Sequence, residues 1–162
     1  MAILNIVKEP DELLRKRSKE VTEFNSRLNQ LLDDMRETMV AAPGVGIAAV
    51  QVGTLYRACL VESKEHGVVE LINAVITKSD DFKEFQVGCL SVPGRRGVVI
   101  YPHKVTVRAQ DRNGKEFTMD FTERDAVCAC HELDHFDGVL FVDKLVENTE
   151  LESEDEESES EE

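Results

Sequence analysis

The segment Thr122-Glu-Arg-Asp-Ala-Val-Cys-Ala-Cys-His-Glu-Leu-Asp-His-Phe-Asp-Gly138 carries the clearest structural signal in this chain. The hydrophobic period changes here from 2 to 3.6 residues, which predicts a helix from about residue 123 to about residue 137. Thr122, with Asp125 three residues later, gives a start like that of a capping box. Gly138 stands where a helix takes a left-handed C-terminal residue, so both ends of the predicted helix are marked.

Two histidines lie four residues apart on this predicted helix. The spacing puts the imidazoles of His131 and His135 on one face, with a metal ion between them and Glu132 beside the site. A chance His-Glu-x-x-His pattern in a chain of this size has a probability of roughly one in a hundred. The alternative is a solvated helix face with two incidental histidines. The pattern favours a metal centre.

A catalytic zinc-like centre needs three protein ligands and an open position for water. Cys89 and Cys128 are the candidates for the third ligand. Cys128 lies about 7.5 Å along the helix axis from the level midway between the histidines, which a cysteine side chain cannot span. Cys130 points off the ligand face. Cys89 is therefore the best candidate, against the alternative that it is a small buried hydrophobic residue.

The run Gly44-Val-Gly-Ile-Ala-Ala-Val-Gln51 is a second unusual segment. Its two glycines permit close approach of the backbone to a ligand, and Gln51 offers an uncharged hydrogen-bond donor. A tight turn after the preceding helix explains the glycines equally well. The segment gains weight only together with the histidine motif.

Periodicity predicts further elements around the histidine helix. We expect an amphipathic helix capped by Asn25 or Ser26, and two β-hairpins, of which the second turns through Asp111-Arg-Asn-Gly114. The helix covers residues 25–41, the first hairpin pairs residues 55–61 with 68–72, and the second pairs residues 105–109 with 117–121.

Length and charge place limits on the class of protein. A chain of 162 residues with 41% hydrophobic content fits one domain, which we expect over residues 1–148. The formal net charge is −14, but residues 150–162 hold nine acidic and no basic residues, so the rest carries 19 minus 24, or −5. We expect residues 149–162 to form a disordered acidic tail. An acidic body argues against specific binding of nucleic acid.

The N-terminus and the cysteines indicate the compartment. The start of the chain does not resemble a signal peptide, and no apolar stretch is long enough to span a membrane. The four cysteines are then expected as free thiols in a reducing cytoplasm.

Three separated motifs resemble those of one family. Gly44-x-Gly-x-Ala-Ala-x-Gln51, Gly88-Cys-Leu-Ser91 and His131-Glu-Leu-Asp-His135 occur in the order found in bacterial-type peptide deformylases, and the similarity extends from Pro10 to Phe141. The resemblance implies an α+β fold, with antiparallel sheets around a central metal-binding helix. It also implies removal of the N-formyl group from the formylmethionine of newly made polypeptides.

The resemblance implies roles for the site residues. The metal ligands would be Cys89, His131 and His135. Glu132 would act as general base and then general acid, while the Gln51 amide and the Leu90 backbone N–H would stabilise the oxyanion. Ferrous iron is the metal that the family usually uses, and zinc, nickel or cobalt would also suit these ligands.

Substrate contacts follow in the same way. The backbone of Val45 and Gly46 would pair with an extended peptide, and Arg96 would meet the peptide backbone or turn to solvent. The methionine side chain would contact Phe85, Val127 and Cys128. The implied partners are N-formylmethionyl nascent chains, met in the region of the ribosome exit.

The chain also departs from the pattern of the family. Val87 replaces a usual acidic residue, Cys130 a usual glutamine, and Arg124 and Asp125 stand where apolar residues are expected. Two alternatives remain at this point: a zinc peptidase, and a deformylase-like binding module that has lost turnover. The peptidase usually takes a downstream histidine or glutamate as its third ligand, and no histidine follows His135.

Overall fold

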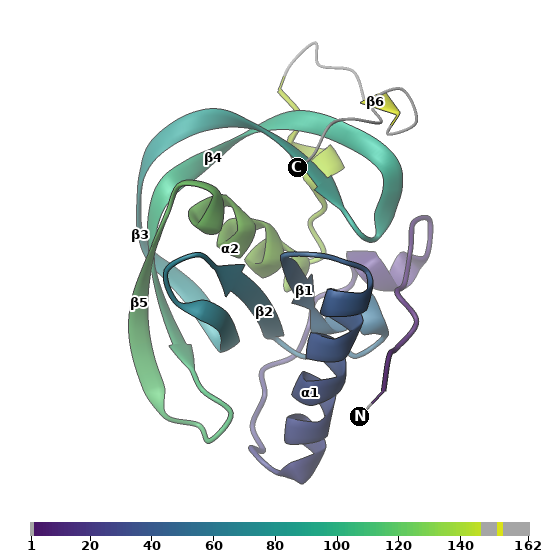
Figure 1. The fold of residues 1–162 in the computed structure, drawn as a ribbon, viewed down its shortest axis with the longest axis vertical. Helices are drawn as coiled ribbons and strands as arrows, with labels where there is room; N and C mark the ends of the chain where they lie inside the picture. The colour runs from purple at the N-terminus through teal and green to yellow at the C-terminus, as the bar shows by residue number, and fades with distance from the viewer. Residues whose placement is uncertain (1, 147–151, 154–162) are drawn as a thin grey trace.

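The computed structural model describes residues 2–146 and 152–153. These residues form an α+β fold in which one helix is surrounded by antiparallel strands (Figure 1). The helices are α1 (Ser26–Ala41) and α2 (Glu123–His135), with the short 3-10 helices η1 (Glu12–Arg15), η2 (Ala49–Val52) and η3 (Phe141–Lys144). The strands are β1 (Gly46–Ala48), β2 (Ala58–Ser63), β3 (Gly67–Cys89), β4 (Val92–Gln110), β5 (Glu116–Thr122) and β6 (Glu152–Ser153).

The strands join in the order β1-β2-β3-β4-β5, with β6 paired to β4, and every pairing is antiparallel. The long β3–β4 hairpin contains register shifts between Ile72 and Val75, between Ile76 and Lys78, and between Gly88 and Cys89. Such irregularities bend a strand and increase its twist. The hairpin accordingly curves around α2 instead of lying flat beside it (Figure 1).

The hydrophobic core has two parts. One cluster packs the apolar side of α2 against the curved sheet and includes Ala126, Ala129 and Phe136. The other lies under α1, where Leu28, Leu32, Met35 and Met39 contact apolar side chains of β1, β2 and β3. Apolar contacts therefore hold one side of the α2 helix, and its two histidines are also buried, on the side that meets the end of β3.

Several sequence predictions are confirmed. The Asn25 side chain caps α1 by accepting a hydrogen bond from the Leu28 N–H at 3.1 Å. The first hairpin forms between β2 and β3, and the second pairs β4 with β5 in the expected register, with Val107 opposite Met119. Most of β3 and β4 was not predicted. The sequence predicts strands only over residues 68–72 and 105–109, whereas these two strands also cover most of residues 73–104.

The predicted ends of α2 are partly wrong. Thr122 makes no side-chain capping bond, and the Asp125 carboxylate instead accepts hydrogen bonds from the Ser63 Oγ (2.9 Å) and the Lys64 N–H (3.0 Å). The helix ends at His135, two residues earlier than predicted. Gly138 does have a left-handed φ of 76°, and a Cβ there would lie 2.3 Å from the Arg15 carbonyl oxygen.

The predicted acidic tail falls mostly outside the described residues. Within it, Glu152–Ser153 form β6, in register with Arg96 and Arg95 of β4. Before the tail, the Val146 N–H donates to the Val98 carbonyl at 2.9 Å. Across the described residues, no helix is both long enough and apolar enough to cross a membrane.

Candidate metal centre and substrate pocket

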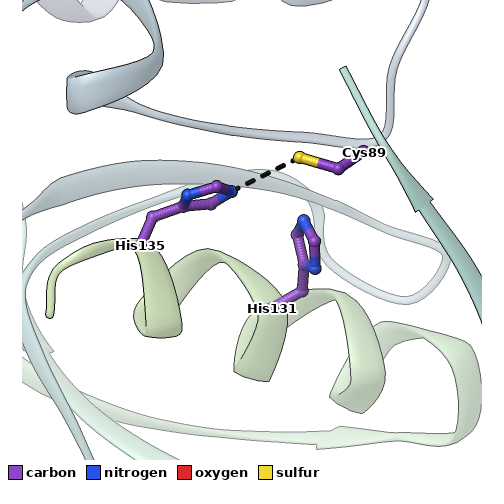
Figure 2. A group of neighbouring side chains, drawn as sticks. All are labelled: Cys89, His131 and His135. Carbon is purple, nitrogen blue, oxygen red and sulfur yellow. Dashed lines mark hydrogen bonds between the residues drawn. The ribbon is translucent and has the colours of Figure 1, made fainter. Parts of the chain in front are cut away.

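Three predicted ligands come together between α2 and the end of β3. The potential donor atoms of Cys89, His131 and His135 all lie within 4.8 Å of one another. The Cys89 Sγ is 3.6 Å from the His135 Nε2, and the two imidazole rings stand at 87° with centroids 5.0 Å apart. Figure 2 shows the thiol pointing from the strand toward the two rings on the helix. Neither Cys128 nor Cys130 belongs to this group.

The protonation of these side chains suits metal binding. Burial lowers the pKa of His131 to about 4 and that of His135 well below its usual value, so both imidazoles are neutral and can offer lone pairs. Burial raises the pKa of the Cys89 thiol to about 12, with the nearby Glu132 acting in the same direction. The thiol must therefore release a proton when it binds a cation. Two neutral imidazoles and one thiolate fit zinc or ferrous iron.

Glu132 lies beside the donor group under the backbone of β1. A Cβ at Gly46 would fall 2.6 Å from the Glu132 Oε2 and 2.8 Å from the Cys128 Sγ, so only glycine fits at this crossing. Glu132 is buried, and its Oε1 makes no hydrogen bond to any described residue. Burial, and next the charge of Asp134, raise the pKa of the Glu132 carboxyl well above its usual value.

Gln51 is held by both ends of its side-chain amide. Its Oε1 accepts a hydrogen bond from the Ala48 N–H at 2.9 Å, and its Nε2 donates to the Ser91 Oγ at 3.1 Å. The same nitrogen lies 3.7 Å from the Cys89 Sγ, so the amide donors face the proposed metal ligands. Ser91 belongs to the predicted motif Gly88-Cys-Leu-Ser91, and its place next to Leu90 is the sequence signal for this supporting role.

The N-terminal segment crosses behind Gln51 and Ser91. The Val7 N–H donates to the Gln51 carbonyl at 2.7 Å, and the Glu9 N–H donates to the Ser91 carbonyl at 2.8 Å. These backbone bonds tie η2 to the turn between β3 and β4. These bonds could not be predicted from the sequence, because backbone hydrogen bonds of this kind have no characteristic side-chain pattern.

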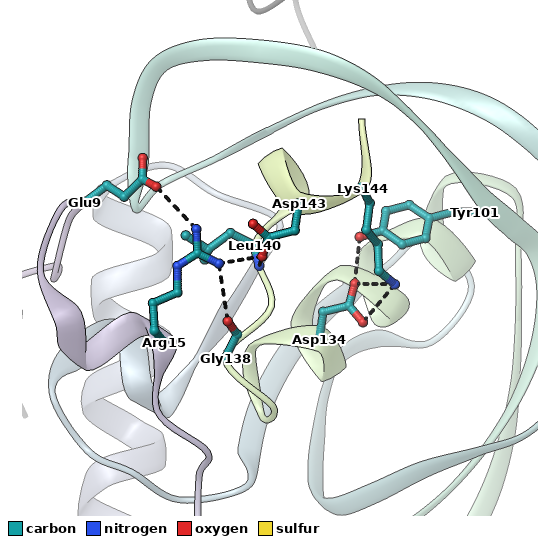
Figure 3. A network of polar contacts seen from close by, with 8 residues as sticks. All are labelled: Glu9, Arg15, Tyr101, Asp134, Gly138, Leu140, Asp143 and Lys144. Carbon is teal, nitrogen blue, oxygen red and sulfur yellow. Dashed lines mark hydrogen bonds and ion pairs between the residues drawn. The ribbon is translucent and has the colours of Figure 1, made fainter. Parts of the chain in front are cut away.

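Arg15 links the N-terminal segment to the chain that follows α2. Its guanidinium contacts the Asp143 carboxylate, lies 3.6 Å from the Glu9 carboxylate and 3.5 Å from the Gly138 carbonyl oxygen. Asp143 also accepts a hydrogen bond from the Leu140 N–H at 3.0 Å. Figure 3 shows these contacts spanning the two segments.

A second group of polar contacts in Figure 3 holds α2 itself. The Tyr101 hydroxyl on β4 donates to the Asp134 carboxylate at 2.8 Å, and the Lys144 Nζ lies 3.1 Å from the same carboxylate. Asp134 lies inside the His-Glu-x-x-His motif, so these contacts fix the helix at the turn that carries the histidines.

A pocket of about 560 Å³ opens over the donor group. It is bounded by the segment before β1, the end of β3 and one face of α2. Apart from His135, which lies next to Cys89, every site residue predicted from the sequence lines this pocket. These residues are Val45, Gly46, Gln51, Phe85, Cys89, Leu90, Arg96, Val127, Cys128, His131 and Glu132.

Two details narrow the predictions for Arg96 and Val45. Arg96 is only 7% exposed, so of the two predicted orientations it does not turn to solvent. The Val45 carbonyl already accepts bonds from the Glu62 N–H (2.8 Å) and the Cys128 thiol (3.3 Å), which leaves the N–H of Val45 for the predicted backbone pairing with a peptide.

An α+β fold with two helical histidines, a cysteine from a strand, an adjacent buried carboxyl group and an open pocket defines a metal-dependent hydrolase. The sequence matches the family described as polypeptide deformylase over residues 3–151. The chain therefore belongs to the peptide deformylase family, whose members are metal-dependent enzymes acting on N-formylmethionyl peptides.

Individual relatives agree with this assignment. The chain is 49% identical to a peptide deformylase of Caldicellulosiruptor bescii, over 90% of this chain and 87% of the relative. It is 46% identical to a peptide deformylase of Acetivibrio thermocellus, over 90% of this chain and 85% of that relative. The crystal structure of a peptide deformylase from Legionella pneumophila superposes with a TM-score of 0.86 at 42% identity, covering 90% of this chain and 87% of that one. The predicted fold class and the deformylase activity are thus confirmed, and the two alternative functions are not favoured.

Proposed function

We propose that this protein releases formate from N-formylmethionyl chains at the pocket over α2, with Cys89, His131 and His135 as ligands of one divalent ion. The observation that carries the proposal is the convergence of these three donors beside Glu132 and Gln51 at the floor of the pocket. Ferrous iron is proposed as the metal in the cell, and zinc, nickel and cobalt suit the same donors. When bound, the ion supplies a Lewis acid that lowers the pKa of a water molecule toward neutrality.

Glu132 is proposed to carry the proton. Its carboxyl group lies at the pocket floor with one oxygen free of other hydrogen bonds among the described residues. A carboxylate in this position can accept a proton from water and then return it to the departing amine. The neighbouring Gly46 leaves just enough space for that carboxyl group.

Gln51 and Leu90 are proposed to stabilise the oxyanion. The Ala48 N–H occupies the amide oxygen of Gln51, so its nitrogen is the end directed toward the Cys89 side of the pocket. Leu90 belongs to the turn between β3 and β4, so its backbone N–H is the second proposed donor. Donors that are fixed before the reaction stabilise developing charge without having to reorganise.

The substrate is proposed to bind as an extended strand. Gly46 and the N–H of Val45 would meet the peptide backbone, while Phe85, Val127 and Cys128 would surround the methionine side chain. We propose that the reaction takes place in the cytoplasm on nascent chains near the ribosome exit. The acidic body of the protein is consistent with a peptide and not a nucleic acid as the partner.

Product analysis tests the proposed chemistry. Metal-loaded protein, prepared without air, is incubated with formyl-Met-Ala-amide, and both formate and free alanine amide are measured. Formate alone is the expected result. Release of alanine amide would indicate a peptidase, and binding of the peptide without any product would indicate a binding module. The Glu132→Gln variant is the matched control, because it leaves the three proposed ligands unchanged.

A further inference from the structure

Arg124 lies on the same face of α2 as the metal centre. Positions 124, 128, 131 and 135 follow the spacing of one helix face, and Arg124 lines the pocket with Cys128 and His131. Seven residues separate Arg124 from His131, a distance of about 10 Å along the helix axis. Arg124 thus borders the pocket at the end remote from the metal ligands.

The guanidinium of Arg124 is held in place by an aromatic ring. Its central carbon is 4.6 Å from the centroid of the Phe85 ring, an arrangement favourable for a cation and a π system. Phe85 in turn contacts the His103 ring edge-on, with centroids 5.7 Å apart. The cation therefore has a defined position at the wall of the pocket, although its side chain is exposed.

The acidic neighbours of Arg124 in the chain do not neutralise it. Glu123 lies 3.6 Å from the His103 Nδ1, and the Asp125 carboxylate is bonded to Ser63 and Lys64. Among the residues that the structure describes, no carboxylate forms an ion pair with Arg124. Its charge is available to a ligand in the pocket.

Arg124 brings a positive charge to the pocket of an acidic protein. It lines the pocket at the end remote from the metal ligands, whereas the whole chain has a net charge of −14. Glu132 lies at the metal end. The opposite end therefore presents positive charge to whatever part of the substrate reaches it.

We propose that Arg124 is a specificity-determining residue that favours formylmethionyl chains with an aspartate or glutamate soon after the formylmethionine. An extended peptide advances about 3.3 Å per residue, so about 10 Å corresponds to roughly three residues. The side chain that meets Arg124 then belongs to the second, third or fourth residue of the substrate. This inference rests on the proposed function, because it assumes that the formyl group lies at the metal end of the pocket.

Matched peptides test the proposal. Formyl-Met-Ala-Ala-Ala-amide is compared with versions that carry Asp or the neutral, isosteric Asn at position two, three or four. The amide removes the C-terminal carboxylate. Affinity is measured on metal-loaded Glu132→Gln protein, which should hold formyl peptides without rapid turnover, and kcat/KM is measured separately on the unaltered protein. Arg124→Leu and Arg124→Lys are the test variants, and Arg27→Leu, an exposed position on α1, is the control for net charge.

We expect the peptide with Asp to bind about three- to five-fold more tightly than the peptide with Asn at one of the three positions. An affinity ratio of this size corresponds to the free energy of a partly exposed ion pair. The preference should weaken with added salt, disappear in Arg124→Leu, survive in part in Arg124→Lys and be unchanged in Arg27→Leu. Equal affinity for Asp and Asn at all three positions would overturn the proposal, as would a preference that persists in Arg124→Leu. Because affinity does not require turnover, absence of formate release would count against the proposed function alone.

Discussion

Cys89 and Cys128 line the pocket and Cys130 precedes His131 in the sequence, but only Cys89 belongs to the donor group. We therefore expect Cys89→Ser to lose bound metal or most activity, because a hydroxyl group replaces the soft thiolate ligand. Cys128→Ser and Cys130→Ser should each keep about one equivalent of metal. Elemental analysis of the purified variants measures this directly. Unchanged metal content in Cys89→Ser would mean that the third ligand has been wrongly assigned.

Glu132 is the residue for which binding and chemistry can be separated. Glu132→Gln preserves the size of the side chain and leaves the proposed ligands in place, but an amide cannot accept the water proton. We expect nearly normal metal content and a loss in kcat of about 100-fold or more. Metal content and formate release should be measured on the same sample. A metal-free variant would show that Glu132 has a structural role instead.

Among the elements of the fold, the N-terminal segment is connected to the chain after α2 through Arg15 and Asp143. Burial alone would raise the pKa of Asp143, but hydrogen bonds from Arg15 and the Leu140 N–H outweigh it and lower that pKa. A carboxyl group whose pKa is lowered by folding stabilises the folded state above its unfolded pKa. That stabilisation disappears as the pH falls through the folded pKa.

We expect Arg15→Met to reduce the free energy of unfolding by about 1 kcal/mol or less at pH 7, since both partners of the ion pair are partly exposed. The difference in unfolding free energy from the unaltered protein should shrink as the pH falls below the ordinary pKa of an aspartate, about 3.9, toward the lower pKa of folded Asp143. Arg17→Met is the control, because Arg17 is 77% exposed and 3.4 Å from Asp137. Urea unfolding at several pH values measures both variants. A difference that grows at low pH would contradict the role given to this ion pair.

For the whole molecule, the acidic tail is predicted to contribute little to the folded domain. Truncation after Asn148 keeps the bond from the Val146 N–H to Val98 and the bridge between Leu145 and Val99, and it removes β6 with its two pairs on β4. We expect unchanged kcat/KM and a thermal midpoint within about 2 °C of that of the full chain. A drop of several degrees would show that the tail is part of the domain.

The parts of the fold that were predictable are those with local signals. The α1 cap, the two hairpin pairings and the histidine face of α2 each depend on residues close together in the sequence. The long β3–β4 hairpin was not predictable because residues 75–84 of β3 are exposed on both faces, apart from the half-buried Asp81, so they show no hydrophobic alternation. Register shifts also interrupt the period. The α2 cap was predicted wrongly, since Asp125 bonds to a distant turn instead.

The candidate site shows the same division. The resemblance of three motifs predicted residues that line the pocket, because the three motifs occur together in one order. The support around them, from Ser91, Tyr101 and the backbone of residues 7–9, joins segments far apart in the sequence and was not predictable. Val87, which stands in place of a usual acidic residue, is 8% exposed at the pocket wall, and we expect it to alter the rate while the reaction is retained.

We propose that a single ion held by Cys89, His131 and His135 makes this chain a deformylase. The most direct measurement is a titration of metal-free protein with ferrous iron or nickel, without air, in which formate release from formyl-Met-Ala-amide is followed at each addition. We predict that activity rises in proportion to bound metal and reaches its plateau at about one ion per chain. Formate release that is independent of added metal, or no release at full metal occupancy, would contradict the account.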